Sequence, residues 1–154
     1  MKAREVLKDC WAACDLLDVE TDPQRFKLLW ISAIALLWAV GHVLDKVDGA
    51  ENQDRKTAIT KAWSSWQANK RENKIFWEFI DKERNVLLKE YEVGFMSMNG
   101  SVIIRRGDHT GELRNELFCP LSDGEFTGED CRDVIRDALL WWEVQLKDIE
   151  AQIT

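Results

Sequence analysis

Two basic residues and an amide fall close together in the segment IFWEFIDKERNVLLKEYEVG, residues 75–94. They are Arg84, Asn85 and Lys89, whose side chains can bind a phosphate group or another anion. At 3.6 residues per turn the segment predicts a helix. Glu83 and Arg84 then lie on stripes that the flanking turns fill with aromatic and aliphatic residues. Because a charge on a packed face is unfavourable unless it is paired and hydrogen-bonded, this segment is the candidate functional site.

The position of Arg84 has two interpretations. In the first, Arg84 pairs with a carboxylate of another helix, such as Asp137 or Glu143, or extends its head group to the end of the bundle. In the second, the helix faces a polar cleft, within the bundle or between subunits, and Arg84 holds an anion there. Both interpretations fit the sequence.

The order Arg84, Asn85, three further residues and Lys89 resembles the signature of the HEPN superfamily, which is Arg, a polar residue, three residues and His. The resemblance implies a small helical bundle. In many members it also implies a metal-independent ribonuclease of toxin or defence type, with a site formed across a homodimer; other members are non-catalytic. It implies that Arg84 binds phosphate, that Asn85 orients the site, and that no metal or cofactor takes part. The implied partners are a second copy, an antitoxin-type protein, and RNA or a nucleotide.

Position 89 departs from that signature, because Lys89 stands where the family has histidine. An imidazole has a pKa of about 6.5 and exchanges protons at neutral pH, whereas the pKa of lysine starts near about 10.4. Lowering it to about 7 requires roughly 4–5 kcal/mol, and the carboxylates of Glu83, Glu90 and Glu92 act in the opposite direction. We therefore expect a non-catalytic module that binds a nucleotide, a phosphate or another protein and acts as a homodimer. The alternative is a metal-independent ribonuclease that uses Arg84 and Lys89.

The two histidines do not supply the missing imidazole in any evident way. His42 lies in an apolar segment and is predicted to be a satisfied core or cleft histidine, while His109 lies in GDHTG, a predicted solvated turn. Arg105 and Arg106 beside it form either a local basic patch or part of an ordinary exposed hairpin. The sequence has no GxGxxG, P-loop, HExxH or GxSxG motif.

Four cysteines, at positions 10, 14, 119 and 131, lack the CxxC spacing of zinc sites. Cys10 and Cys14 fall on the apolar stripe of the first predicted helix, so we expect buried core fillers, no metal and no disulfide. Free thiols fit a reducing compartment, which indicates a cytoplasmic protein.

The composition fits a globular protein, with 154 residues, 45% of them hydrophobic and 32% charged. A net charge of −7 excludes a general coat for nucleic acid, since that affinity comes from many Lys and Arg contacts with phosphate. The longest apolar run, residues 28–44, is at the lower limit for a membrane span. Because its flanks read as amphipathic helices, we predict a buried central helix and no membrane.

The fold is predicted to be mainly α, one domain over residues 1–154, built as a bundle of about five helices. Helices are expected at 3–19, 23–47, 54–70 and 74–94, and along the stripe Cys131, Ile135, Ala138, Trp142, Leu146, Ile149 and Ile153. Thr21 or Asp22 is the expected N-cap of the second helix, Gly49 its stop, and Thr127 with Asp130 a capping box for the last. Residues 69–73 can be loop or exposed turn. Residues 95–127 are predicted to be an irregular or β-hairpin insertion.

Eight tryptophans are many for a chain of this length. Five lie on or beside predicted core stripes: Trp30, Trp38, Trp63, Trp77 and Trp142. Trp66 is placed near a polar flank and Trp141 on a different face of the last helix. We interpret the tryptophans as core and homodimer-interface residues rather than as a stacking platform for single-stranded nucleic acid.

Overall fold

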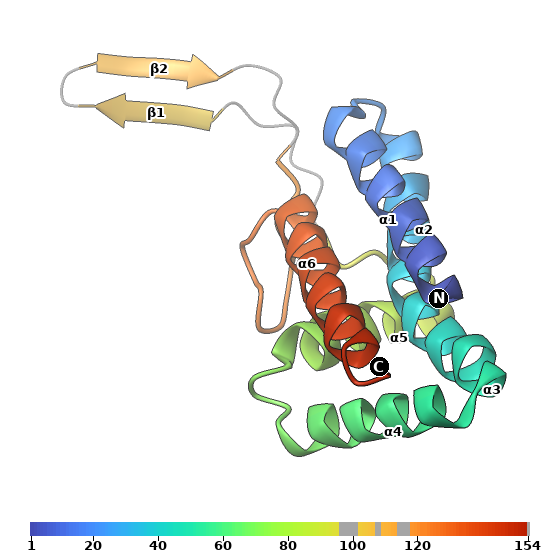
Figure 1. Ribbon diagram of the computed structural model, residues 1–154. Coiled ribbons are helices and arrows are strands. Elements are labelled where there is room, and N and C mark those ends of the chain that lie inside the picture. The colour runs from blue at the N-terminus through green and yellow to red at the C-terminus, as the bar shows by residue number, and fades with distance from the viewer. Residues whose placement is uncertain (96–101, 107–108, 114–117, 154) are drawn as a thin grey trace.

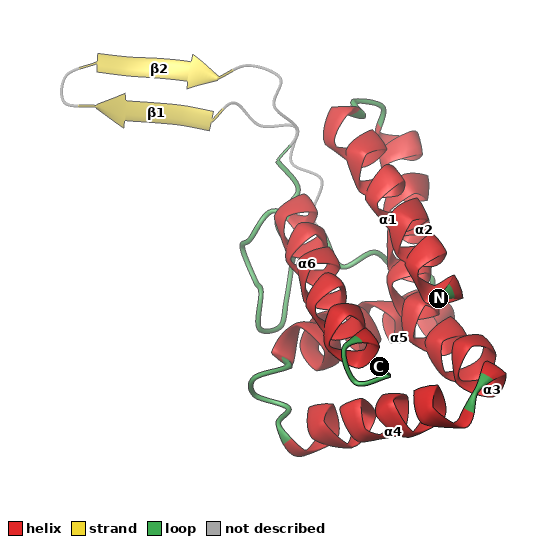
Figure 2. Cartoon of the chain, in the orientation of Figure 1, coloured by secondary structure: helices red, strands yellow, loops and turns green. Residues whose placement is uncertain are grey.

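The computed structural model describes residues 1–95, 102–106, 109–113 and 118–153, and side chains only outside 96–117. Its elements in chain order are α1 (Lys2–Val19), α2 (Pro23–Val43), η1 (Leu44–Asp48), α3 (Gly49–Glu51), α4 (Gln53–Ala68), η2 (Phe76–Ile80), α5 (Asp81–Glu90), β1 (Val102–Arg106), β2 (His109–Leu113) and α6 (Cys131–Glu150). Here η marks a π-helical segment. Because η1 joins α2 to α3, and η2 leads directly into α5, the elements form about five helical rods and one hairpin (Figure 2). The predicted mainly α bundle is confirmed.

Helices α1 and α2 lie antiparallel, α6 runs beside them, and α4 crosses one end of the group (Figure 1). The predicted apolar stripe of α6 forms one wall of the core: Cys131, Ile135, Ala138, Trp142, Leu146 and Ile149 are all buried. Burial of apolar surface is the main favourable term in folding. The helical spacing of these buried residues is therefore visible in the sequence and predicts the last helix.

The prediction that α2 is the buried centre of the packing is correct for one face only. Phe26, Trp30 and Leu37 are buried against the rest of the bundle. On the opposite face Leu28 and Ala35 are exposed. The continuous rod from Pro23 to Glu51 is long and apolar enough to cross a membrane by length and composition alone, and a third of its most apolar window is buried.

Gly49 does not end the second helix, contrary to the prediction. Its φ of −70° is helical, and the rod continues to Glu51 before Asn52 turns extended at φ −159°. A Cβ at Gly49 would lie 3.1 Å from Cδ of Lys56, so glycine is used there for close packing rather than for a left-handed turn. Asn52 then caps α4, accepting from the backbone N–H of Arg55 at 2.8 Å.

Three other helix ends refine the expected boundaries. Asp22 is the N-cap of α2, as predicted, and accepts from Arg25 N–H at 2.8 Å. Helix α4 stops at Ala68, and residues 69–73 form a turn that is exposed except for Asn73, which is buried. Helix α5 ends at Glu90 rather than near Gly94, because Tyr91 adopts the left-handed region at φ 54°.

The predicted capping box of α6 is wrong. The hydroxyl of Thr127 donates to the carbonyl of Gly124 at 2.6 Å, outside the helix. Asp130 is the N-cap instead, and its carboxylate accepts from Arg132 N–H at 3.0 Å. An aspartate is a strong cap in itself, so the Thr–Asp spacing was not needed to begin the helix.

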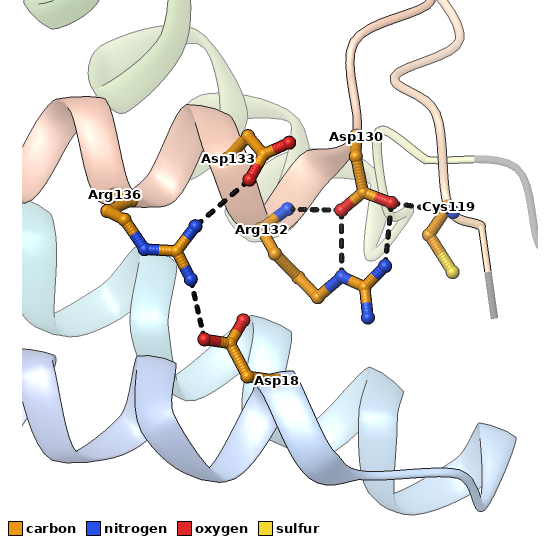
Figure 3. A network of polar contacts seen from close by, with 6 residues as sticks. All are labelled: Asp18, Cys119, Asp130, Arg132, Asp133 and Arg136. Atoms are coloured by element: carbon orange, nitrogen blue, oxygen red, sulfur yellow. Dashed lines mark hydrogen bonds and ion pairs between the residues drawn. The ribbon is translucent and has the colours of Figure 1, made fainter. Parts of the chain in front are cut away.

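Asp130 also organises the start of α6 (Figure 3). Its carboxylate accepts from Nε and Nη2 of Arg132 at 2.8 and 2.9 Å, and from the backbone N–H of Cys119 at 3.3 Å. Burial alone would raise the pKa of Asp130, but these donors hold it below its usual range. One turn further on, Arg136 pairs with Asp18 of α1 at 2.5 Å, which ties the two helices together.

Within residues 95–127, β1 and β2 form the expected antiparallel hairpin, from the pair Val102–Leu113 to the pair Arg106–His109. Among the described elements each strand contacts only the other, and the hairpin projects away from the bundle (Figure 1). His109 opens β2 rather than lying in a turn. The rest of the predicted turn, residues 107–108, lies outside the described part of the chain. The side chains of Arg105 and Arg106 are likewise not described, so the basic patch stays a prediction.

Candidate functional site

Glu83 occupies a buried position on the α5 face that packs against the core. It is 5% exposed, and the backbone N–H of Gly94 donates to its carboxylate. Burial raises the pKa of Glu83 above its usual range. A Cβ at position 94 would fall 2.2 Å from Oε2 of Glu83. Glu83 therefore fastens the chain that follows α5, and its role is structural.

Arg84 is half-buried and sits over an aromatic ring rather than beside a carboxylate. Its guanidinium carbon lies 4.2 Å from the ring centre of Trp38 on α2. Its Nη1 donates to Oδ1 of Asn85 at 2.6 Å, and Nδ2 of Asn85 donates to Asp81 at 3.1 Å. The asparagine thus orients the arginine, and stacking on the indole holds the guanidinium plane.

The carboxylate interpretation of Arg84 is not supported by the described residues. Four other arginines of the described chain are half-buried, and each pairs with a carboxylate: Arg4, Arg55, Arg132 and Arg136. No described carboxylate lies within 4 Å of Arg84, and its Nε is buried without an acceptor there. Glu143, one expected partner, accepts from Arg4 and Trp11 instead.

Lys89 does not join this group within one copy of the chain. It is exposed near the end of α5. Five residues along a helix correspond to a rotation of about 140°, so Lys89 and Arg84 project from different sides. Of the three predicted site residues, the structure brings together Arg84 and Asn85 only.

His42 is exposed, so it is not a core histidine, but it lines the cavity described below, which agrees with the cleft alternative of the prediction. Its ring stacks on Trp38 with centroids 5.1 Å apart and planes 20° from parallel. Arg84 and His42 therefore contact the same indole from two different helices. The sequence signal for this was the i, i+4 spacing of Trp38 and His42, which places the two rings on one face of a helix.

A cavity of about 280 Å³ adjoins the same indole. Its walls are mostly aromatic, formed by Trp38, Trp63, Trp66, Phe76 and Trp142. Trp66 is buried, although the sequence placed it near a polar flank, and Trp63 is 38% exposed although it was predicted in the core. Gly41, Leu44 and Ile59 add apolar surface, and the polar residues of the lining are His42, Asp45 and Thr60.

The cysteines are core residues, as predicted. All four are free and buried, and burial raises the pKa of Cys10 to about 12. Cys10 therefore stays protonated at neutral pH, which makes it a poor nucleophile and a poor metal ligand, whereas a hydrogen bond with Cys131 lowers the pKa of Cys119. The described part of the chain contains no cluster of His, Cys, Asp and Glu that could hold a metal ion.

Two features of the described chain could bind a ligand: Arg84 with its neighbours Asn85 and Trp38, and the aromatic cavity. Both include Trp38. No family model, curated protein or solved structure matches this chain. The function is therefore argued from these side chains.

Proposed function

We propose that this chain is a HEPN-like, non-catalytic module that binds a phosphate-bearing ligand, such as a nucleotide, through Arg84 and acts as a homodimer. The observation that carries the proposal is the missing carboxylate at Arg84. A half-buried guanidinium without an anionic partner among the described residues, held in place by an indole and an amide, can bind an anion with its remaining donors.

Phosphate suits this site better than a simple anion. A guanidinium presents its donors in a planar fork that matches two phosphate oxygens. Asn85 takes one donor of Nη1 and fixes the fork, and Trp38 covers one face of it. The exposed ring of His42, which stacks on Trp38, also offers aromatic surface on which a base can stack. These features together favour a nucleotide.

The outward face of α2 supports the homodimer. Leu28, Ser32 and Ala35 are exposed there, at a spacing that places them on one stripe of the helix. Leu28 is the large exposed apolar residue of this stripe, and the small side chains of Ser32 and Ala35 allow a second helix to approach closely. We expect light scattering at micromolar concentration to give the mass of two chains, against 17.9 kDa for one. A monomer over that range would contradict this part of the proposal.

We expect Arg84→Ala to weaken nucleotide binding by about 10- to 100-fold, which corresponds to the loss of one charge-assisted hydrogen-bonded pair. Titration calorimetry with adenosine 5′-monophosphate, and separately with inorganic phosphate, measures the change. Arg84→Lys keeps the charge but loses the planar fork, so it should recover only part of the affinity.

Arg71→Ala is the matched control, because Arg71 is exposed and the charge change is the same. It should bind as the wild type does. Circular dichroism should give the same helix content for all variants. Equal affinity of wild type and Arg84→Ala, both folded, would exclude Arg84 as the phosphate ligand.

The ribonuclease alternative is tested on the same proteins. It requires Lys89, or another group from a second copy, to act as acid or base at Arg84. Incubation of RNA with wild type in EDTA should then give cleavage that both Arg84→Ala and Lys89→Ala abolish. Intact RNA with the wild type would leave the binding module as the proposal.

A further inference from the structure

The aromatic cavity is open to solvent on one side, because His42, Thr60 and Trp63 of its lining are exposed. A ligand can therefore enter it from outside. A cavity of about 150 Å³ in another protein is known to take up benzene, so about 280 Å³ has room for two fused rings. Five aromatic walls give such a ring flat surfaces for stacking and edge contacts.

Both π-helical segments border this cavity. Leu44 and Asp45 line it from η1, and Phe76 lines it from η2. A π segment disturbs the regular helical hydrogen bonding, and such segments occur frequently at functional sites. Two of them meeting at one cavity is an observation independent of the cavity's size.

Asp45 is the charged residue of the lining, and two lysines that do not line the cavity themselves bond to it. Its carboxylate accepts from Lys46 at 2.8 Å and from Lys56 at 2.5 Å. These hydrogen bonds hold the pKa of Asp45 below its usual range, so the group is one anion between two cations and sums to one positive charge. A ligand whose anionic substituent reaches past Asp45 to the lysines is therefore favoured over one with a positive substituent.

We propose that the cavity binds a planar aromatic molecule of up to two fused rings that carries an anionic group, with the ring among the tryptophans and the anion toward Lys46 and Lys56. This inference goes beyond the proposed function: the cavity shares Trp38 with the Arg84 site, but its test does not involve Arg84. The ligand class follows from the aromatic walls, the volume and the charge at the rim.

The test uses indole-3-carboxylate as probe and the eight tryptophan indole N–H signals of the ¹⁵N-labelled protein as readout. Titration should shift the signals of the four tryptophans that line the cavity: Trp38, Trp63, Trp66 and Trp142. Trp11 and Trp30 line no part of it and should not move. Indole, which lacks the charge, should bind about tenfold more weakly, and acetate, which lacks the ring, should cause no shift.

A matched pair of variants on α4 blocks the cavity or leaves it open. Thr60 lines the cavity and Ser64, one turn on, does not. Both are exposed, and both hydroxyls donate to the carbonyl four residues earlier, at 2.8 and 3.0 Å. Thr60→Phe should weaken probe binding at least about tenfold, and Ser64→Phe should leave it within about twofold.

Three results would overturn the proposal. One is the absence of shifts at millimolar probe, and another is an equal shift of Trp11 and Trp30. The third is wild-type affinity in Thr60→Phe with its helix content unchanged. Equal affinities for indole and indole-3-carboxylate would overturn the anionic part of the assignment.

Discussion

Replacing Trp142 with alanine is expected to lower the free energy of unfolding by about 3–5 kcal/mol, the range for a buried aromatic residue. Trp142 is 0% exposed, and its Nε1 donates to the carbonyl of Leu37 at 3.0 Å. Gly41 lets the ring lie directly against α2, since a Cβ there would be 3.0 Å from the indole. The change therefore removes contacts between α2 and α6 and takes away the hydrogen bond that links the two helices through the indole.

The effect should be at the upper end of that range, because the vacated space adjoins the existing cavity. Neighbouring side chains have little to collapse onto, and the loss grows with the cavity that remains. Urea unfolding followed by circular dichroism measures it. Val144→Ala, at a residue of α6 that is 54% exposed, is the control and should change stability by less than about 0.5 kcal/mol. A loss below about 1 kcal/mol in Trp142→Ala would mean that this indole is not part of the core.

Asp48→Ala should destabilise the protein by about 2–4 kcal/mol, since two backbone donors lose a charged acceptor. Asp48 is 0% exposed and accepts from the N–H groups of Lys2 at 2.6 Å and Ala3 at 2.8 Å. Met1, the N-cap residue of α1, provides no side-chain cap. The carboxylate from η1 therefore caps α1 and also complements the positive end of its dipole.

Asp48→Asn keeps one oxygen acceptor and should lose about half as much stability. Hydrogen exchange at the first turn of α1 should accelerate in both variants. Asp15→Ala, at an exposed position of α1, is the control for a simple change of charge. If Asp48→Asn were as unstable as Asp48→Ala, or if neither changed, the capping role would be disproved.

Local patterns in the sequence were enough to predict most of the fold. The apolar stripe of α6 and the Asp22–Pro23 start of α2 each depend on residues close together in the chain, and both appear where they were expected. The prediction for Gly49 was wrong because this glycine allows close packing against Lys56 of α4. The local sequence pattern contains no information about that contact. The sequence of α2 is apolar on both faces. Composition alone does not show that the rest of the bundle buries only one of these two faces.

The candidate site was predictable in part for the same reason. The motif located Arg84 and Asn85, which are adjacent, but Trp38 lies on another helix and was assigned only to the core. The aromatic walls of the cavity come from four elements, so the residue spacing within any one segment could not predict the cavity. The cap that Asp48 of η1 provides for α1 likewise depends on the folded chain, because the two segments are far apart in the sequence.

The position of Trp38 has a thermodynamic consequence. This indole contacts the Arg84 guanidinium and also forms part of the cavity wall, so a ligand that displaces it changes the binding free energy at both places. By linkage the effect is reciprocal: whatever factor an aromatic anion imposes on the affinity for phosphate, phosphate imposes on the affinity for the aromatic anion. One side chain could thus make the occupancy of each site depend on the concentrations of two different molecules.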